Sequence, residues 1–186
     1  MSPTLPPASS LKELPQEQQF QTLDTLFESS PELHTLMAPV LASQTFSSYT
    51  SLIDAVGGRM SALSAANSPT DREILVGILG SHPRLGQPKT AAAGGSAEHL
   101  SELSKKEQAN LNTGAAEQAE KLRALNAEYE KKFPGLRFVT FVNNRSRDVI
   151  MEEMRQRIDR GDFEKETEEV IQAMCDIAKS RAGQLA

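Results

Sequence analysis

The sequence predicts an all-α protein, a single-domain helical bundle with at most one short extended segment near residues 136–142. Apolar residues recur at helical spacing through almost every long segment, and only one short run is rich in aromatic and β-branched residues. No internal repeat of roughly 20 to 50 residues is visible. With 186 residues, of which 38% are hydrophobic and 24% charged, the chain is long enough to bury a sizeable core. We therefore expect a bundle of roughly six to eight helices.

The first half of the chain predicts three amphipathic helices. The second is interrupted in its pattern by Gly57-Gly58, and the third begins with Thr70 and Glu73 at the spacing of a capping box. Gly80 and Pro83 close the third helix. The three helices cover residues 16–29, 48–63 and 68–83.

The second half continues the helical pattern after one interruption. The small, polar, glycine-bearing stretch 87–102 predicts a mobile loop, and a long helix follows over residues 104–133 until Pro134-Gly135 stops it. The run LRFVTFV, residues 136–142, is the one β-like stretch, and it is equally compatible with an extended connector. Two further amphipathic helices are expected from Ser146 onward.

The ends of the chain suggest a domain spanning residues 15–182. Residues 1–14 include MSPTLPPASS, which lacks the basic and apolar parts of a signal peptide, and we expect them to form a disordered lead-in. The C-terminal GQLA is not a peroxisomal signal of the S-K-L type, so the expected location is the cytoplasm, with the peroxisome as the alternative.

Charge and composition argue against several classes of function. A net charge of −5 argues against nucleic acid as a partner, because phosphate binding needs a concentrated basic face. No segment approaches the roughly eighteen consecutive apolar residues that a membrane helix requires. The only cysteine, Cys175, lies at helical spacing among apolar neighbours, which predicts a core residue rather than a nucleophile. The three histidines show no metal-binding spacing, so we expect no metal.

Three stretches carry polar residues that a plain bundle does not need. His82 lies at a helix end before a proline, SKKEQ (104–108) supplies a hydroxyl, a carboxylate and an amide within one turn, and NNRS (143–146) puts Arg145 at the start of a helix. Each has a purely structural alternative. An isolated histidine beside an apolar run is usually a core residue, Ser104 and Glu107 have capping-box spacing, and Arg145 is compatible with a surface cation. Local physics alone favours the capping role for SKKEQ.

The order of the motifs resembles one family. LFESSPEL, SHPRLG, SKKEQ, LNAEYEKKF and FVTFVNNRS, the last followed by an amphipathic helix, are similar to segments of the decarboxylases of 2-oxo-4-hydroxy-4-carboxy-5-ureidoimidazoline (OHCU). These enzymes follow uricase and the hydrolase in urate breakdown. The resemblance runs from about Phe20 to Ala178, nearly the whole chain, and the four motifs from SHPRLG to FVTFVNNRS, in the right order, make it specific.

The resemblance implies the helical fold of that family, cofactor-free decarboxylation of OHCU to (S)-allantoin, and a homodimer. The catalytic residues it implies are His82 and Glu107. Those it implies for binding the anionic ureidoimidazoline substrate are Pro83, Ser104, Gln108 and Arg145.

The sequence departs from the family pattern at three places. The loop between His82 and Glu107 is longer than usual, Arg84 stands where an acidic residue is common, and NNRS replaces KGRS. The longer loop puts the fit of the substrate in question. Two alternatives to the enzyme remain open: a non-catalytic helical adaptor, in which the three polar stretches are scattered and solvated, and a divergent family member that has lost or changed its activity.

Overall fold

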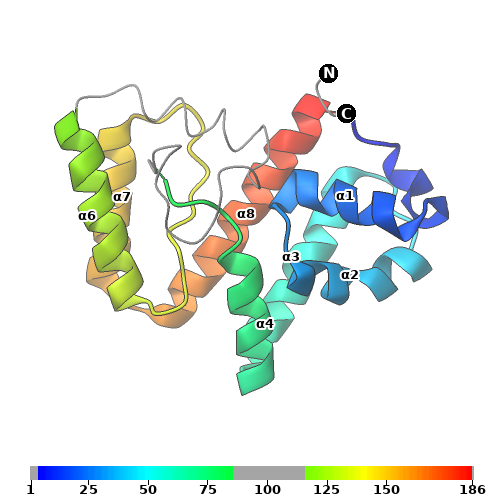
Figure 1. Ribbon diagram of the computed structural model, residues 1–186, viewed down its shortest axis with the longest axis horizontal. Coiled ribbons are helices and arrows are strands. Elements are labelled where there is room, and N and C mark those ends of the chain that lie inside the picture. Colours follow the sequence, from blue (N-terminus) through cyan, green and yellow to red (C-terminus); the bar gives the residue numbers. More distant parts are fainter. Residues whose placement is uncertain (1–3, 86–115, 186) are drawn as a thin grey trace.

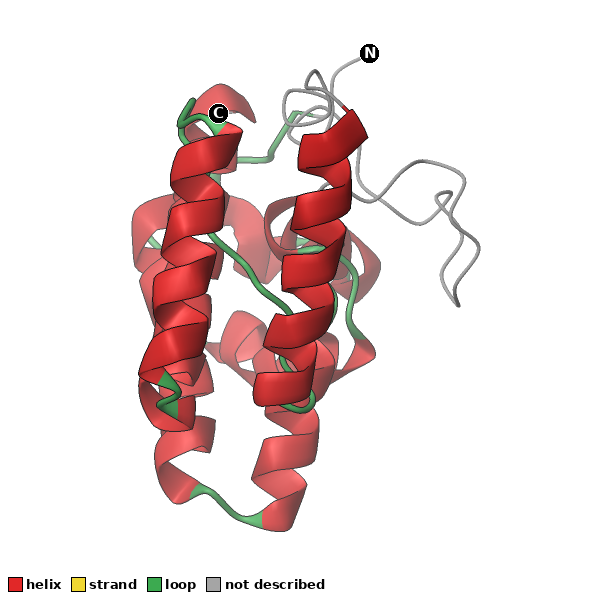
Figure 2. Cartoon of the chain, turned by 90° about the vertical axis from the view of Figure 1, so that its left-hand side faces the viewer, coloured by secondary structure: helices red, strands yellow, loops and turns green. Residues whose placement is uncertain are grey.

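A computed structural model describes residues 4–85 and 116–185, and these residues confirm the all-α prediction. No strand occurs among them, and Figure 2 draws them as helices, loops and turns. The elements are η1 (Ala8–Glu13, a 3-10 helix), α1 (Gln16–Phe27), α2 (Pro31–Ser43), α3 (Tyr49–Ala66), α4 (Pro69–Leu79), α6 (Ala116–Lys132), α7 (Arg147–Arg160) and α8 (Phe163–Leu185).

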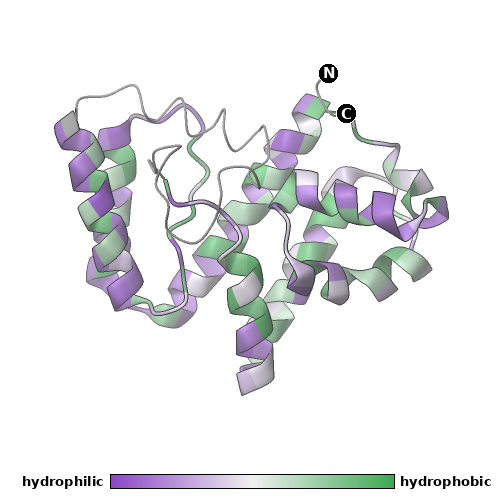
Figure 3. Ribbon diagram, in the orientation of Figure 1, coloured by the Kyte–Doolittle hydropathy of each residue, from purple (hydrophilic) through white to green (hydrophobic). Residues whose placement is uncertain are grey.

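The C-terminal helix α8 is the axis of the fold. It packs against α1 and α3 on one side, while α6 and α7 pair with each other at the opposite end of the molecule (Figure 1). Figure 3 shows that α6 and α7 carry many hydrophilic residues, whereas apolar residues concentrate where α3, α4 and α8 meet. The longest helix therefore connects the N-terminal helices to the α6–α7 pair.

Serine residues mark the beginnings of four helices. Their side-chain oxygens accept hydrogen bonds from the backbone N–H three residues later, which satisfies a donor that the helix itself leaves free. The capping serines are Ser30, Ser48, Ser68 and Ser146. The expected capping box at Thr70 and Glu73 is wrong: α4 begins two residues earlier, at Pro69, and Ser68 pairs with Asp71 instead.

Helix α3 continues through Gly57-Gly58, where the sequence pattern suggested an interruption. A Cβ atom on Gly57 would lie 2.9 Å from the sulfur of Cys175 on α8, whereas one on Gly58 would meet nothing within 4 Å. The first glycine thus lets α3 and α8 approach closely. Cys175 is buried, which raises the pKa of its thiol to about 11 and fits the predicted core role.

The expectation of a disordered lead-in over residues 1–14 is wrong for the part that the structure describes. Leu11 in η1 is 1% exposed, Gln19 donates to its carbonyl (2.8 Å), and the hydroxyl of Tyr49 donates to the carbonyl of Pro6 (2.6 Å). Leu5 also donates its N–H to the carbonyl of Leu185, the last residue of α8 (3.3 Å). The buried Leu11 and these hydrogen bonds anchor the segment.

The run 136–142 is an extended connector without a partner strand among the described residues. Its carbonyls bind arginine side chains instead: Val139 accepts from Arg157 (3.2 Å), and Phe141 and Val142 accept from Arg145 (2.6 and 3.1 Å). Arginine donors therefore satisfy these backbone acceptors in place of a sheet.

A buried ionic network fastens α6, α7 and α8 together. Glu166 on α8 is fully buried and accepts from Arg157 on α7, at 2.9 Å from Nε and 2.5 Å from Nη2. The hydroxyl of Tyr129 on α6 donates to the same carboxylate, and the Arg157 guanidinium lies 4.6 Å from the centre of the Phe138 ring. One carboxylate thus connects three helices.

Candidate active site

His82 lies in the short turn that ends α4. The hydroxyl and the backbone N–H of Ser81 both donate to the carbonyl of Ile78 (2.7 and 3.2 Å), which ends the helix, and Pro83 cannot continue it. The imidazole is only 4% exposed, and its Nε2 has no hydrogen-bond partner among the described residues. The turn therefore buries a ring nitrogen that is free to bind a ligand.

The residues that follow His82 are held from the opposite side of the turn. Arg137 donates to the backbone carbonyl of His82 (3.3 Å), and Asn126 on α6 donates to that of Leu85 (3.0 Å). Arg84, which stands where the family commonly has an acid, pairs with Glu130 on α6 at 2.7 Å. The arginine that replaces the usual acid therefore has a carboxylate partner on α6.

A buried ion pair lies beside the imidazole. Glu28, directly after α1, is 3% exposed, Arg181 on α8 is fully buried, and Glu28 Oε1 lies 3.1 Å from Arg181 Nη2. Arg181 also donates to the carbonyl of Leu26 (3.2 Å), so it fixes the end of α1. The sequence reasoning missed both as functional candidates, although Glu28 is the acid of LFESSPEL; Arg181 lies beyond the end of the resemblance.

Burial lowers the pKa of His82 from 6.5 to about 4. The positive charge of Arg181 lowers it as well, whereas the negative charge of Glu28 opposes both effects. The imidazole is therefore neutral near pH 7, with one nitrogen able to accept a hydrogen bond or a proton.

Arg145 is positioned by a tight turn at the start of α7. Asn143 and Asn144 have positive φ angles of 46° and 60°, a conformation that asparagine tolerates better than most residues. Asn144 can thus replace the glycine of the family's KGRS motif. Ser146 caps α7, as expected, by accepting from the N–H of Val149 (3.3 Å).

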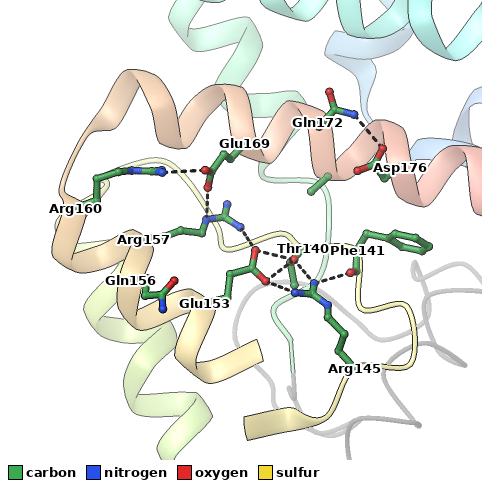
Figure 4. A pocket seen from close by; sticks show the side chains of 11 residues that line it. Thr140, Phe141, Arg145, Glu153, Gln156, Arg157, Arg160, Glu169, Gln172 and Asp176 are labelled. Atoms are coloured by element: carbon green, nitrogen blue, oxygen red, sulfur yellow. Dashed lines mark hydrogen bonds and ion pairs between the residues drawn. The ribbon is translucent and has the colours of Figure 1, made fainter. Parts of the chain in front are cut away.

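The guanidinium of Arg145 is already heavily engaged (Figure 4). In addition to the two carbonyls of the extended connector, it donates to the hydroxyl of Thr140 (2.8 Å) and to the carboxylate of Glu153 (2.7 Å). Four of its five N–H groups are used in these contacts among the described residues, and the fifth belongs to Nη1.

Arg145 lines a pocket of about 580 Å³ between the connector, α7 and α8. Charges of both signs line it in equal number: Arg145, Arg157 and Arg160, with Glu153, Glu169 and Asp176. Glu153 lies between Arg145 and Arg157, at 2.7 and 3.2 Å, and Arg160 pairs with Glu169 at 2.8 Å (Figure 4). The acids balance the arginines, so the charged side chains that line the pocket carry no net charge.

Three of the six predicted site residues lie in the described part of the chain. His82 and half-buried Pro83 end α4, whereas Arg145 lies in the α7–α8 pocket, which His82 does not line. No hydrogen bond or ion pair within the described ranges joins His82 to Arg145. Ser104, Glu107 and Gln108 lie outside the described residues, so the choice between a helix cap and a site stays a prediction.

Arg147, in the first turn of α7, is a further cation that the sequence reasoning missed. Its side chain is buried (the residue is 8% exposed), and none of its three nitrogens has a hydrogen-bond partner among the described residues. Burying a guanidinium without a partner is costly, so its donors are suited to an anionic group.

The described part of the chain offers no group of three or more histidine, cysteine, aspartate or glutamate side chains arranged to hold a metal ion. Within the same residues, no helix has the length and apolar character needed to cross a membrane.

The comparison with family models gives one match. The model of the OHCU decarboxylase family matches residues 12–183, nearly the whole of the 186-residue chain. No curated protein matches the sequence. The family match agrees with the helical fold and with the order of the motifs from LFESSPEL to NNRS. The chain therefore belongs to the OHCU decarboxylase family, which places it among the lyases of urate degradation.

Proposed function

We propose that this protein converts OHCU to (S)-allantoin without a cofactor. Family membership gives the reaction class, and the observation that carries the proposal for this chain is His82, a buried, neutral imidazole whose Nε2 is unpartnered among the described residues. A histidine that only filled the core would have a partner for this nitrogen, because leaving it unpaired is costly. Its burial also counts against a helical adaptor with solvated polar stretches.

The chemistry of the substrate explains why a cofactor is not required. The bond between the ring carbon and its carboxylate breaks, carbon dioxide leaves, and the electron pair flows into the adjacent C=N bond. The substrate is thus its own electron sink. The protein has to hold the carboxylate out of the ring plane, manage the proton of the hydroxyl group and deliver one proton to one face of the ring.

We assign His82 to proton transfer at the hydroxyl or at the developing carbanion. The imidazole is neutral near pH 7, so it begins the reaction as a proton acceptor. With a pKa of about 4 it is a weak base in the empty site. A bound anion would favour the imidazolium and raise this pKa, because opposite charges stabilise each other. Substrate binding would therefore make the base stronger at the moment it is needed.

We assign Arg145 to substrate binding. Its Nη1 group has one N–H without an acceptor among the described residues, and its bond to Glu153 is the one a substrate oxyanion can replace. Pro83 would shape the wall next to His82. Glu107 would orient the imidazole or bind the ring hydroxyl, and Ser104 and Gln108 would bind the ureido and amide edges, as the family resemblance implies. A homodimer is part of the same proposal.

The handedness of allantoin tests the proposed activity. In a reaction containing uricase, the hydrolase and this protein, we expect one enantiomer to form, whereas spontaneous decay of OHCU gives a racemate. His82→Asn should retain the far-ultraviolet circular dichroism of the parent and lose about a hundredfold or more in turnover. Racemic allantoin at the spontaneous rate, formed in the presence of folded parent protein, would refute the proposed function.

A further inference from the structure

The turn of residues 82–85 is held by side chains rather than by its own backbone. It makes no backbone–backbone hydrogen bond within the described ranges. Two of its carbonyls accept from side chains instead: that of His82 from Nη1 of Arg137 (3.3 Å), and that of Leu85 from the amide of Asn126 on α6 (3.0 Å). The extended connector passes the end of α4 (Figure 1), so the place of the imidazole depends on α6 and on this connector.

Glu130 on α6 connects two arginines beside this turn. Its Oε1 lies 2.7 Å from Nε of Arg84 and 4.0 Å from Nε of Arg137. Burial and the charge of Arg84 both lower the pKa of Arg137, whereas the charge of Glu130 opposes them. The carboxylate thus lets two like-charged side chains lie next to each other, one from the turn and one from the connector.

Overall stability is a poor explanation for these contacts. The side chains of Arg84, Glu130 and Arg137 are 33%, 27% and 35% exposed, and ion pairs with this much access to water contribute little to the free energy of unfolding. Helix α4 itself is held by apolar side chains such as that of Ile78, which is fully buried. The contacts beyond its end therefore act locally, by fixing the backbone at His82.

Proton transfer is sensitive to small displacements of the base. A shift of about 1 Å in a reacting group can cost about a hundredfold in rate. The carbonyl that Arg137 holds belongs to the same residue whose imidazole has the unpartnered Nε2. A change in the backbone at His82 moves the whole side chain, so a contact that fixes this backbone also fixes the base.

We propose that Arg137 and Glu130 are positioning residues for His82: Arg137 holds the backbone carbonyl of the histidine, and Glu130 holds both Arg137 and Arg84, so that the turn is clamped to α6. This inference rests on the proposed function of His82. It also gives Arg84 a role, because an acid at this position, as is common in the family, would be repelled by Glu130.

Chemical labelling tests the clamp without any substrate. Diethyl pyrocarbonate acylates neutral imidazoles that it can reach, and His82, which is 4% exposed, should react slowly in the parent protein. We expect this labelling, followed by peptide mass spectrometry, to be at least about fivefold faster in Arg137→Met and in Glu130→Gln, because a loosened turn opens more often. His34 on α2, which pairs with Asp24, is the internal reference and should react at an unchanged rate.

Steady-state kinetics supplies the second measurement. In the same two variants kcat should fall at least about tenfold, with KM within about twofold and the melting temperature within a few degrees, because the base is displaced while the fold is kept. Arg137→Lys retains a cationic donor for the carbonyl of His82 and should keep kcat within about threefold of the parent. Arg123→Gln removes an arginine of α6 whose ion pair with Glu120 is exposed, and should match the parent in both measurements.

Arg84→Gln is a milder variant, because it removes only the partly exposed partner of Glu130. It should speed the labelling of His82 and lower kcat, each by a smaller factor than Glu130→Gln does. The clamp can therefore still be tested if one of the stronger variants unfolds.

The outcomes separate this inference from the proposed function. Parental labelling and parental kcat in the folded variants overturn the inference. A loss of kcat without faster labelling of His82 also overturns it, as does faster labelling at the parental kcat. A parent protein that forms only racemic allantoin refutes the proposed function, while the labelling still decides whether the clamp holds the turn.

Discussion

The buried imidazole makes the stability of the protein depend on pH in a way that can be calculated. The pKa of His82 is about 4 in the folded protein and about 6.5 in the unfolded chain. A depressed pKa means that the unfolded state binds the proton first, so this contribution to stability is present above about pH 6.5 and is lost as the pH falls toward about 4. Between about pH 7 and about pH 5, these two values correspond to a loss of about 2 kcal/mol.

Urea denaturation at a series of pH values measures this loss. The free energy of unfolding of the parent should fall more steeply over this range than that of His82→Asn, and the difference should be about 2 kcal/mol. Comparing slopes removes any constant cost of the substitution and the contribution of carboxylates, which both proteins share. Parallel curves for the two proteins would show that His82 is not held neutral by burial, and the reasoning about its role as a base would fail with it.

Three further predictions follow from the same contacts. Glu166→Gln should lower the free energy of unfolding by about 3 kcal/mol, because it removes the fully buried carboxylate that pairs with Arg157 and accepts from Tyr129. Glu128→Gln, at an exposed ion pair with Arg155, should cost much less, and similar losses in urea denaturation would contradict this. Gly57→Ala should lower the melting temperature, because the new Cβ atom would lie 2.9 Å from the sulfur of Cys175. Gly58→Ala should raise the melting temperature, because its Cβ atom would meet nothing within 4 Å and alanine favours a helix more than glycine does. Equal shifts in the two variants would show that α3 and α8 separate easily. The acidic limb of the kcat/KM profile should lie near pH 4, the pKa of His82 in the free enzyme. The acidic limb of the kcat profile should lie at higher pH, because a bound anionic substrate raises the pKa of the imidazole. Two limbs at the same pH would show that substrate binding does not change this pKa.

The sequence predicted local structure well where one helix face is apolar and an end signal is close by. The helix before His82, the Ser146 cap and the core role of Cys175 are all confirmed. It missed α2, whose buried Leu33, Met37 and Leu41 are accompanied by an internal proline that breaks the usual pattern. It also placed the start of α4 two residues late. Ser68 with Asp71 and Thr70 with Glu73 both have the spacing of a capping box, and only the backbone geometry shows that Ser68 is the cap.

The sequence indicated which side chains are candidates for the site but not the contacts that they make in the fold. Motif order selected His82 and Arg145 as candidates, because the chemistry of a family fixes which side chains occur and in what succession. It did not indicate that Arg145 would be engaged by Glu153 and the connector carbonyls, which are three to eight residues away but meet it only when the chain turns at Asn143 and Asn144.

By itself the sequence determined the fold class and the family, and it selected His82 as a candidate, because periodicity, capping and motif order are properties of nearby residues. Only the tertiary structure decided the state of that histidine. Its imidazole is buried, and the charges that act on it come from Glu28, directly after α1, and from Arg181 on α8, which are far from His82 along the chain. Electrostatic interactions depend on distance in space and on the removal of water, and neither can be read from the order of residues.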